Sequence, residues 1–379
     1  MPGTTSTTPT DARRQAAARS DALHDALERL AGYGFVDGPG FACHGTMGAE
    51  ALSSLGYDGE VATWVETYKR THAPIDAPPA GRAIDLTDEA SWRPALGDVT
   101  RMSDWEEAFR RALWDAYWGD VLRRWLPVLL PGHAGGLGHG LLRTAHAVRA
   151  LATVPTPADG LFLDELARGL GSWAGWSASL PGRPALRGAL GLDDAIRALP
   201  RPAAPWTPIE AGTFSRLPEL DGFTAAVDDL APPAPGGDPL GALSAAFARI
   251  VPAGAGPAVQ GLVHTVTPVA AMRALLPHVA PGDAFGAIDT VVARLWHAGA
   301  AIVTGFAPAR LPDPAAAEAG VAGGDPGDLA ARAVEHGDPH AVKFVEACLA
   351  EHRRQPDPAY LAAAAAVVDR LPVMGGRGG

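Results

Sequence analysis

The sequence predicts an all-α protein, a single compact multi-helix domain with long Pro/Gly-rich loops. Ala and Leu dominate while β-branched residues are few, a balance that favours helices over a large sheet. Hydrophobic residues make up 47% of the chain and charged residues 19%, which is typical of a globular protein. A chain of 379 residues is also long enough to bury a large core.

Composition divides the chain into a core region and two tails. Residues 1–18 are small, polar and unpatterned, so we expect a disordered N-terminal tail, and residues 371–379 predict a flexible C-terminal tail. The helical domain then covers residues 19–370. Within it, residues 200–240 are rich in Pro, Asp and Gly, which predicts an irregular loop or a lid.

Apolar spacing and capping residues predict the helices. Ser20 is a candidate N-cap for the first one, and no strand is persuasive. The later helices are expected at residues 46–55, 61–71, 104–130 (as one or two helices), 141–154, 258–276, 287–303, 328–335, 339–353 and 358–370.

Several classes of function are disfavoured by composition. The formal net charge of −11 argues against a nucleic-acid partner. No apolar run is long enough for a membrane helix, and the N-terminus lacks the apolar segment of a secretory signal, so we expect a cytoplasmic protein. Two cysteines, Cys43 and Cys348, form neither a disulfide framework nor a zinc motif. The oligomeric state is left open.

A glycine run, Gly136, Gly138 and Gly140, superficially resembles a dinucleotide-binding loop. It lacks the third glycine at the required offset and a preceding strand. We therefore expect these glycines to allow a tight backbone turn before a helix.

Six of the twelve histidines lie in apolar or glycine-rich surroundings: His44, His139, His146, His264, His297 and His340. Alone, each is more often a hydrogen-bonded core residue than a ligand. Burying all of them separately would require many separate partners, whereas one metal ion satisfies several together. His24, His72 and His352 lie among charged residues and are expected at the surface.

Lysine usage is unusual, because only Lys69 and Lys343 accompany 29 arginines. Lys343 lies among apolar residues, where a desolvated amine can lose its proton and add carbon dioxide to form a carbamate. His340, three residues earlier, shares its helix face. A Lys343–Glu346 ion pair on a half-buried helix explains the same pattern equally well, and both interpretations stay open here.

Four separated segments, together with their order and spacing, resemble the questin oxidase-like family. They are FACHGTMGAEALSSLG, GLGHGLLRTAHAVRAL, GLVHTVTPVAAMRALLPH and GDPHAVKFVEACLAEH, which span about residues 40 to 355. The family includes enzymes that open the quinone ring of anthraquinones in polyketide pathways. One departure stands out, because family members commonly have asparagine where this chain has Cys43.

The resemblance implies a non-haem iron centre held by four histidines and a carboxylated lysine. The matched metal-binding and catalytic positions are His44, His139, His264, His340 and Lys343. His146 and His297 are then residues of the core or of the surroundings of the centre.

The function that follows is an Fe(II)-dependent oxygenase, which uses dioxygen for Baeyer–Villiger or dioxygenase-type ring cleavage of an aromatic polyketide or quinone. Carbon dioxide is needed for the lysine carbamate, and NADPH is the expected external reductant if the reaction requires one. Arg143 or the Trp114/Trp118 region is a weak candidate for orienting the substrate, because the two tryptophans are more often simply core.

Two alternatives remain. A carbamylated lysine can bridge two metals in a metallohydrolase, although the His-x-His pair and alternating strands and helices of such barrels are missing. A non-catalytic helical metal-binding protein is the other alternative.

Overall fold

The prediction of an all-α fold is confirmed. The computed structural model describes residues 9–38, 41–154, 158, 160–203, 206, 214–279, 288–311 and 324–375. Within this part of the chain it contains 16 α-helices in a single domain. The only sheet in these ranges is a hairpin of β1 (Val36–Asp37) and β2 (Phe41–Ala42), in which Val36 pairs with Ala42.

The first half of the chain forms α1 (Pro9–Arg29), α2 (Gly45–Ser54), α3 (Val61–Thr71), α4 (Glu89–Trp92), α5 (Met102–Asp115), α6 (Trp118–Leu129), α7 (His139–Leu151) and α8 (Gly160–Trp176). The second half forms α9 (Leu192–Ala198), α11 (Phe223–Asp228), α12 (Pro239–Ile250), α13 (Pro257–Leu275), α14 (Ile288–Phe306), α16 (Pro326–His336), α17 (Pro339–Arg354) and α18 (Pro358–Arg370).

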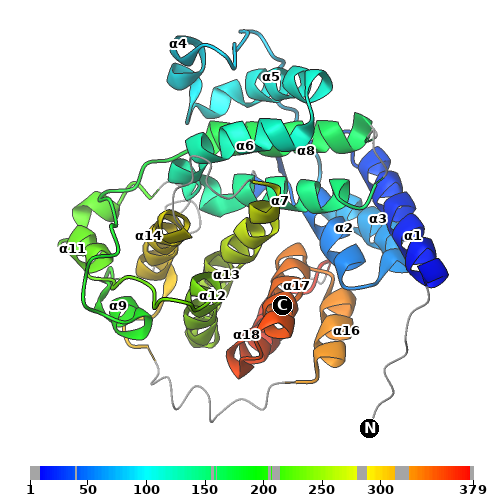
Figure 1. The fold of residues 1–379 in the computed structure, drawn as a ribbon. Coiled ribbons are helices and arrows are strands. Elements are labelled where there is room, and N and C mark those ends of the chain that lie inside the picture. Colours follow the sequence, from blue (N-terminus) through cyan, green and yellow to red (C-terminus); the bar gives the residue numbers. More distant parts are fainter. Residues whose placement is uncertain are drawn as a thin grey trace.

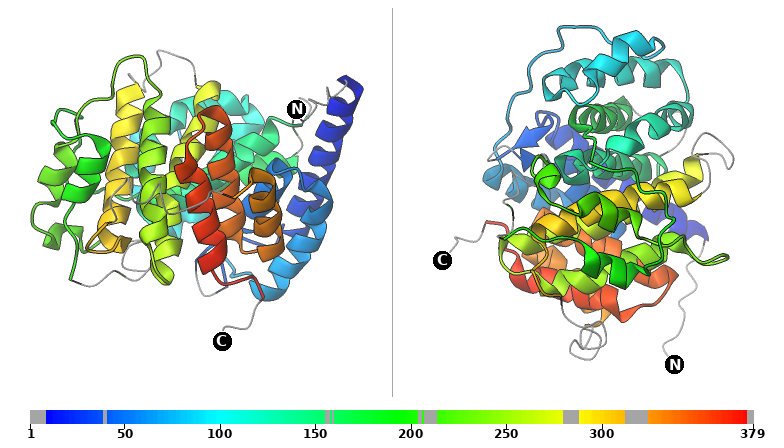
Figure 2. Two further views of the ribbon diagram at one scale, coloured as in Figure 1. Left: turned by 90° about the horizontal axis from the view of Figure 1, so that it is seen from below. Right: turned by 90° about the vertical axis from the view of Figure 1, so that its left-hand side faces the viewer.

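Helix α7 lies at the centre of the fold and packs against α8, α13 and α2 (Figure 1). On one side of it, α5 and α8 form a layer with α6. On the other side, α14, α13, α17 and α16 stand side by side, as the view from below also shows (Figure 2). Helix α17 also packs against α2, so the four helices α2, α7, α13 and α17 surround one region of the core.

Asp-Pro pairs start four of the helices in the second half of the chain. The aspartates Asp238, Asp325, Asp338 and Asp357 are the N-caps of α12, α16, α17 and α18, and each side chain accepts a hydrogen bond from a backbone N–H of the first turn. The following proline fits the first helical position because its fixed φ angle suits the helix and it has no N–H to leave unpaired.

Some expected boundaries were wrong. Ser20 does not cap a helix, because α1 begins at Pro9 and continues through the expected tail; residues 1–8 lie outside the described residues. Residues 371–375 contact the folded domain, since Leu371 is buried and the Met374 N–H donates to the His336 carbonyl; residues 376–379 are not described.

The sequence analysis did not predict two of the long helices, α8 and α12. The described part of 200–240 is irregular as expected, apart from a 3-10 turn, α11 and the start of α12. No helix of the described chain is both long and apolar enough to cross a membrane.

A buried ion network connects α1, α2, α7 and α17. The Glu50 carboxylate accepts hydrogen bonds from Arg19 at 2.8 Å, His146 at 2.6 Å and Arg149 at 2.5 Å. Arg149 also donates to Glu346 at 2.9 Å. Burial opposes ionisation of Glu50, but Arg149 and His146 hold its pKa well below the ordinary value, so the carboxylate is charged at neutral pH.

We predict that Glu50→Ala destabilises the protein by about 1–3 kcal/mol, because His146 loses its carboxylate partner and the half-buried Arg149 keeps only Glu346. Urea unfolding at pH 7 measures this change. Glu89→Ala is the matched control, since the Glu89–Arg93 pair is solvent-exposed and should contribute less than about 1 kcal/mol. Equal losses in the two variants would contradict the prediction.

Candidate metal centre

The structure brings together the four histidines that the sequence singled out as ligands. His44 precedes α2, His139 is the first residue of α7, His264 lies within α13 and His340 is the second residue of α17. The ring centroid of His44 is 4.7 Å from that of His139 and 4.4 Å from that of His340. His264 lies 4.5 Å from His139 and 5.6 Å from His340 by the same measure.

Three of these residues form a group that could hold a metal ion. One ring nitrogen from each of His44, His139 and His340 lies within 4.8 Å of the others, and all three residues are buried. The Nε2 atoms of His44 and His139 are only 2.9 Å apart. The nitrogens of His264 stand outside this group, although its ring packs against two members.

Two buried nitrogens beside this group lack a hydrogen-bond partner in the described part of the chain. They are Nδ1 of His264 and Nζ of Lys343. Lys343 lies one turn after His340 on α17 and is 3% exposed. Leaving a buried donor or acceptor unpaired costs about 1–3 kcal/mol. A cation and its ligands would satisfy both atoms.

Burial sets the protonation state of the cluster. It lowers the pKa of all four histidines, and for His44, His139 and His264 the lowering is large because repulsion from neighbouring rings and Lys343 adds to burial. Burial also lowers the pKa of Lys343 to about 7. The imidazoles are therefore neutral, the form that binds metals.

Contacts behind the ligands fix their orientation. His139 Nδ1 lies 2.6 Å from the Gly136 carbonyl, which suits an N–H donor there and leaves Nε2 to face the cluster. The Asp338 carboxylate lies 3.6 Å from His340 Nδ1. The backbone N–H of His44 donates to the Tyr68 hydroxyl at 2.8 Å.

The glycine run before α7 makes the tight turn that the sequence predicts. Gly136, Leu137 and Gly138 adopt left-handed backbone angles with φ of 58°, 56° and 80°. Gly140 is required for a different reason, since a Cβ atom there would lie 2.3 Å from the Trp173 Cα atom of α8. Leu137 is strained because it has a side chain, and that side chain lines the pocket described next.

A pocket of about 230 Å³ opens over the histidines. The four histidines form one part of its lining, together with Asp37, Phe41, His72, Leu137, Gln260, Gly261, Asp338 and Pro339. Phe41 is 43% exposed, which makes it an apolar residue accessible from solvent. The centre is therefore reachable by a small molecule, as a catalytic site requires. None of the lining residues comes from 200–240, so the described part of that segment is not a lid over this pocket.

Several sequence-based assignments change. His72 is half-buried, stacks on Tyr68 at 4.3 Å and lines the pocket, so it is not a plain surface residue. The alternative interpretation, an ion pair between Lys343 and Glu346, is wrong. Glu346 pairs with Arg149, and the lysine amine has no hydrogen-bond partner in the described chain.

The candidates for orienting a substrate are also wrong. Arg143 is buried and pairs through two nitrogens with Glu165, and it does not line the pocket. Trp114 is 64% exposed and does not line the pocket, whereas Trp118 packs against the core, as expected, and lies beside His278.

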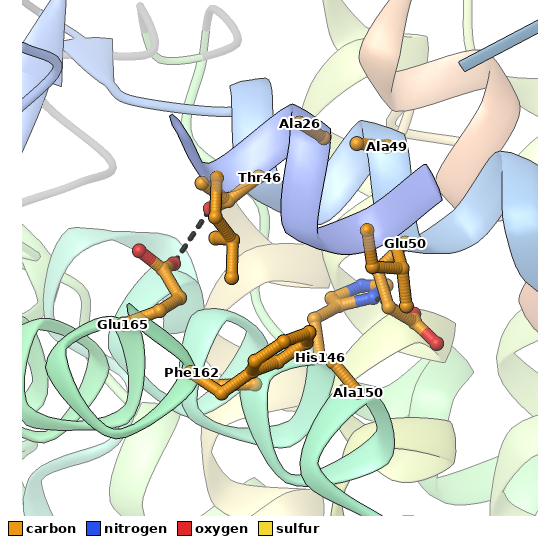
Figure 3. Close-up of a pocket in the computed structure, with 11 residues that line it drawn as sticks. Ala26, Thr46, Ala49, Glu50, His146, Ala150, Phe162 and Glu165 are labelled. Atoms are coloured by element: carbon orange, nitrogen blue, oxygen red, sulfur yellow. Dashed lines mark hydrogen bonds and ion pairs between the residues drawn. The ribbon is translucent and has the colours of Figure 1, made fainter. Parts of the chain in front are cut away.

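His146 and His297 lie outside the cluster. His146 belongs to the ion network around Glu50, and His297 Nε2 lies 2.9 Å from the Pro181 carbonyl. A second, small cavity between α1, α2, α7 and α8 is bordered by Glu50, His146 and Glu165 (Figure 3). Its carboxylates are already paired, as the bond from Thr46 Oγ1 to Glu165 at 2.6 Å illustrates, so this cavity offers no free ligand (Figure 3).

The sequence reasoning missed Asp37, Leu137 and Gln260 as pocket residues. Gln260 had a usable signal, because it lies one turn before His264 on the same helix face. Asp37 had none, because it reaches the pocket through the short hairpin that the sequence did not predict.

The lowered histidine pKa values predict the pH dependence of the metal-free protein. An unfolded histidine titrates near pH 6.5, while these buried histidines bind protons only at lower pH. The unfolded state then takes up more protons, so the contribution of these histidines to stability is complete above about pH 6.5 and falls below it by about 1.4 kcal/mol per pH unit for each histidine. Urea unfolding between pH 5 and 7.5 measures the slope.

His264→Gln removes one titrating group and should reduce that slope by about one histidine's share. A wild-type stability that does not change between pH 5 and 6.5 would contradict the assignment of neutral imidazoles.

Comparison with models of protein families finds none that matches the chain, and comparison with curated proteins finds no sequence match.

Proposed function

We propose that this protein is a non-haem iron oxygenase whose metal is held by His44, His139, His264, His340 and a carboxylated Lys343. The observation that carries the proposal is the convergence of the buried histidines from four helices beside a buried, unpartnered lysine. The resemblance to the questin oxidase-like family supplies the reaction class, oxidative ring cleavage of an aromatic polyketide or quinone.

The donor set fits a divalent transition metal. Imidazole nitrogens with a hard oxygen ligand suit iron(II), and zinc or manganese would also bind them. The oxygen ligand would come from Lys343, whose neutral amine forms a bond to the carbon of carbon dioxide and releases a proton. The resulting carbamate replaces a costly buried amine with an anion that is paired with the metal.

The helix termini support the same charge balance. His44, His139 and His340 stand at the starts of α2, α7 and α17, so the positive ends of three helix dipoles meet at this place. Such ends disfavour imidazolium and favour anions, which here means the carbamate and reduced forms of oxygen. When bound, iron would supply the activation of dioxygen.

The residues of the chain have the remaining tasks. The histidines present neutral nitrogens, Gly136 and Asp338 orient two of them, and Leu137 and Phe41 offer apolar contact to an aromatic ring. NADPH stays the expected reductant if one is required.

A hydrolase with two metals is less well supported. Across the described residues only one group of three ligand residues could hold a metal, and all its members are histidines. A bridging site would need further carboxylates or imidazoles beside Lys343.

Metal analysis tests the proposal directly. We expect about one iron per chain in protein purified without added metal, with an anomalous-scattering peak next to His44, His139 and His340 and extra density on Lys343 Nζ. Two zinc or nickel ions per chain would favour hydrolysis instead. Absence of any metal after growth with iron would contradict both.

Lys343→Met separates metal binding from folding. The methionine fills similar space without a buried amine, so the metal-free variant should be more stable than wild type by roughly 1–3 kcal/mol. Its iron content should fall at least about tenfold, because an anionic ligand is lost. Unfolding curves and mass spectrometry of bound metal measure the two effects.

Lys69→Met is the matched control, since Lys69 is the only other lysine and lies 35% exposed on α3. It should change neither quantity. Unchanged iron in Lys343→Met would make the lysine a structural residue and remove it from the proposed ligand set.

A further inference from the structure

The charged side chains in the walls of the histidine pocket, apart from the histidines, are all acidic. Asp37 and Asp338 line it, and no lysine or arginine does among the described residues. The Lys343 amine lies beneath the histidines and is not part of the lining. An aromatic substrate with a negative substituent would thus find no cationic side chain away from the metal.

Asp37 differs from Asp338 because it caps no helix in the described part of the chain. It is 1% exposed at the end of β1, and the Tyr68 hydroxyl donates a hydrogen bond to its Oδ2 atom. The Cys43 thiol is a second donor, and burial keeps this thiol protonated by raising its pKa to about 12. Burial raises the pKa of Asp37, and this rise is opposed by the hydrogen bonds from Tyr68 and Cys43 and by the nearby His72 and Arg143. A buried carboxylate of this kind gains from one more donor.

Asp338 already has a role in the fold. Its carboxylate accepts hydrogen bonds from the backbone N–H groups of His340 at 2.9 Å and Ala341 at 3.2 Å at the start of α17. Its charge still faces the pocket, so it repels a second anion there. Gln260 supplies a neutral carboxamide from α13.

We infer that Asp37 determines the specificity of the pocket, which accepts a neutral aromatic substrate with a hydroxyl group and rejects aromatic carboxylates. The hydroxyl donates to Asp37, while the ring packs against Leu137 and Phe41. A carboxylate at the same position meets Asp37 and Asp338 without a positive partner. This inference rests on the proposed function, because it deepens the description of the same site.

The test uses two probes with the same ring and the same position of substitution, 2-naphthol, which donates a hydrogen bond, and 2-naphthoate, which is an anion without a donor. Isothermal titration calorimetry at pH 7.5, with iron-loaded protein and without oxygen, measures both dissociation constants. We expect wild type to bind 2-naphthol at least about tenfold more tightly than 2-naphthoate, as expected for one charge-assisted hydrogen bond.

Asp37→Asn should reduce the preference for 2-naphthol over 2-naphthoate. Asparagine keeps an acceptor for Tyr68 but loses the charge, so 2-naphthol binding should weaken about tenfold and 2-naphthoate binding should strengthen. The metal attracts the naphthoate equally in both proteins, so the change in the ratio of the two constants reports on Asp37 alone. Asp120→Asn, an exposed substitution on α6, is the matched control and should leave the ratio unchanged.

A second variant keeps the inference testable if Asp37→Asn does not fold. Gln260→Glu adds a carboxylate from a half-buried position and should weaken 2-naphthoate binding about tenfold with little effect on 2-naphthol.

The results overturn the inference if wild type binds the two probes equally, prefers 2-naphthoate or binds neither. An unchanged ratio in Asp37→Asn also overturns it. Iron content, measured on the same samples, tests the proposed function separately. If the protein holds iron but shows no preference between the probes, the proposed metal centre stands and only the role of Asp37 in specificity is rejected.

Discussion

The rest of the structure depends on the burial of several uncharged nitrogen bases at one place in a helical core. Four imidazoles and one amine give up their contacts with water, and two of these nitrogens have no partner in the described chain. Desolvation makes their charged forms unfavourable, so the four imidazoles are neutral at neutral pH and the pKa of Lys343 falls to about 7. A fold that only needed stability would have filled this space with apolar side chains. The cost is consistent with a centre that is complete only when a metal binds.

Two structural features, an ion network and a left-handed turn, hold the ligands in place. Behind the cluster, the ion network around Glu50 and Arg149 joins α2, α7 and α17, the helices that carry three of the histidines and the lysine. In front of it, the left-handed turn through Leu137 sets the direction from which α7 begins. Both features use buried charge or backbone strain, which are unfavourable alone and tolerated because the surrounding packing fixes them.

Charge divides the site into two parts with different preferences. The floor has histidines and three helix starts, which favour anionic ligands beside a cation. Asp37 and Asp338 also line the pocket, and their negative charges disfavour a second anion there. A neutral aromatic molecule can approach the histidines without being repelled by the two aspartates.

The sequence by itself determined the helical class and most helix positions, because composition and capping residues are local signals. It also reduced the twelve histidines to six candidates and drew attention to Lys343, whereas the choice of four histidines came from the family resemblance. It left open whether Lys343 pairs with Glu346, and it missed α8, α12 and the hairpin that carries Asp37. Only the tertiary structure decided these points. Whether an amine finds a partner depends on Arg149, nearly two hundred residues before Glu346 in the chain, and which side chains meet at a pocket depends on how distant helices pack. Local periodicity carries no information about either.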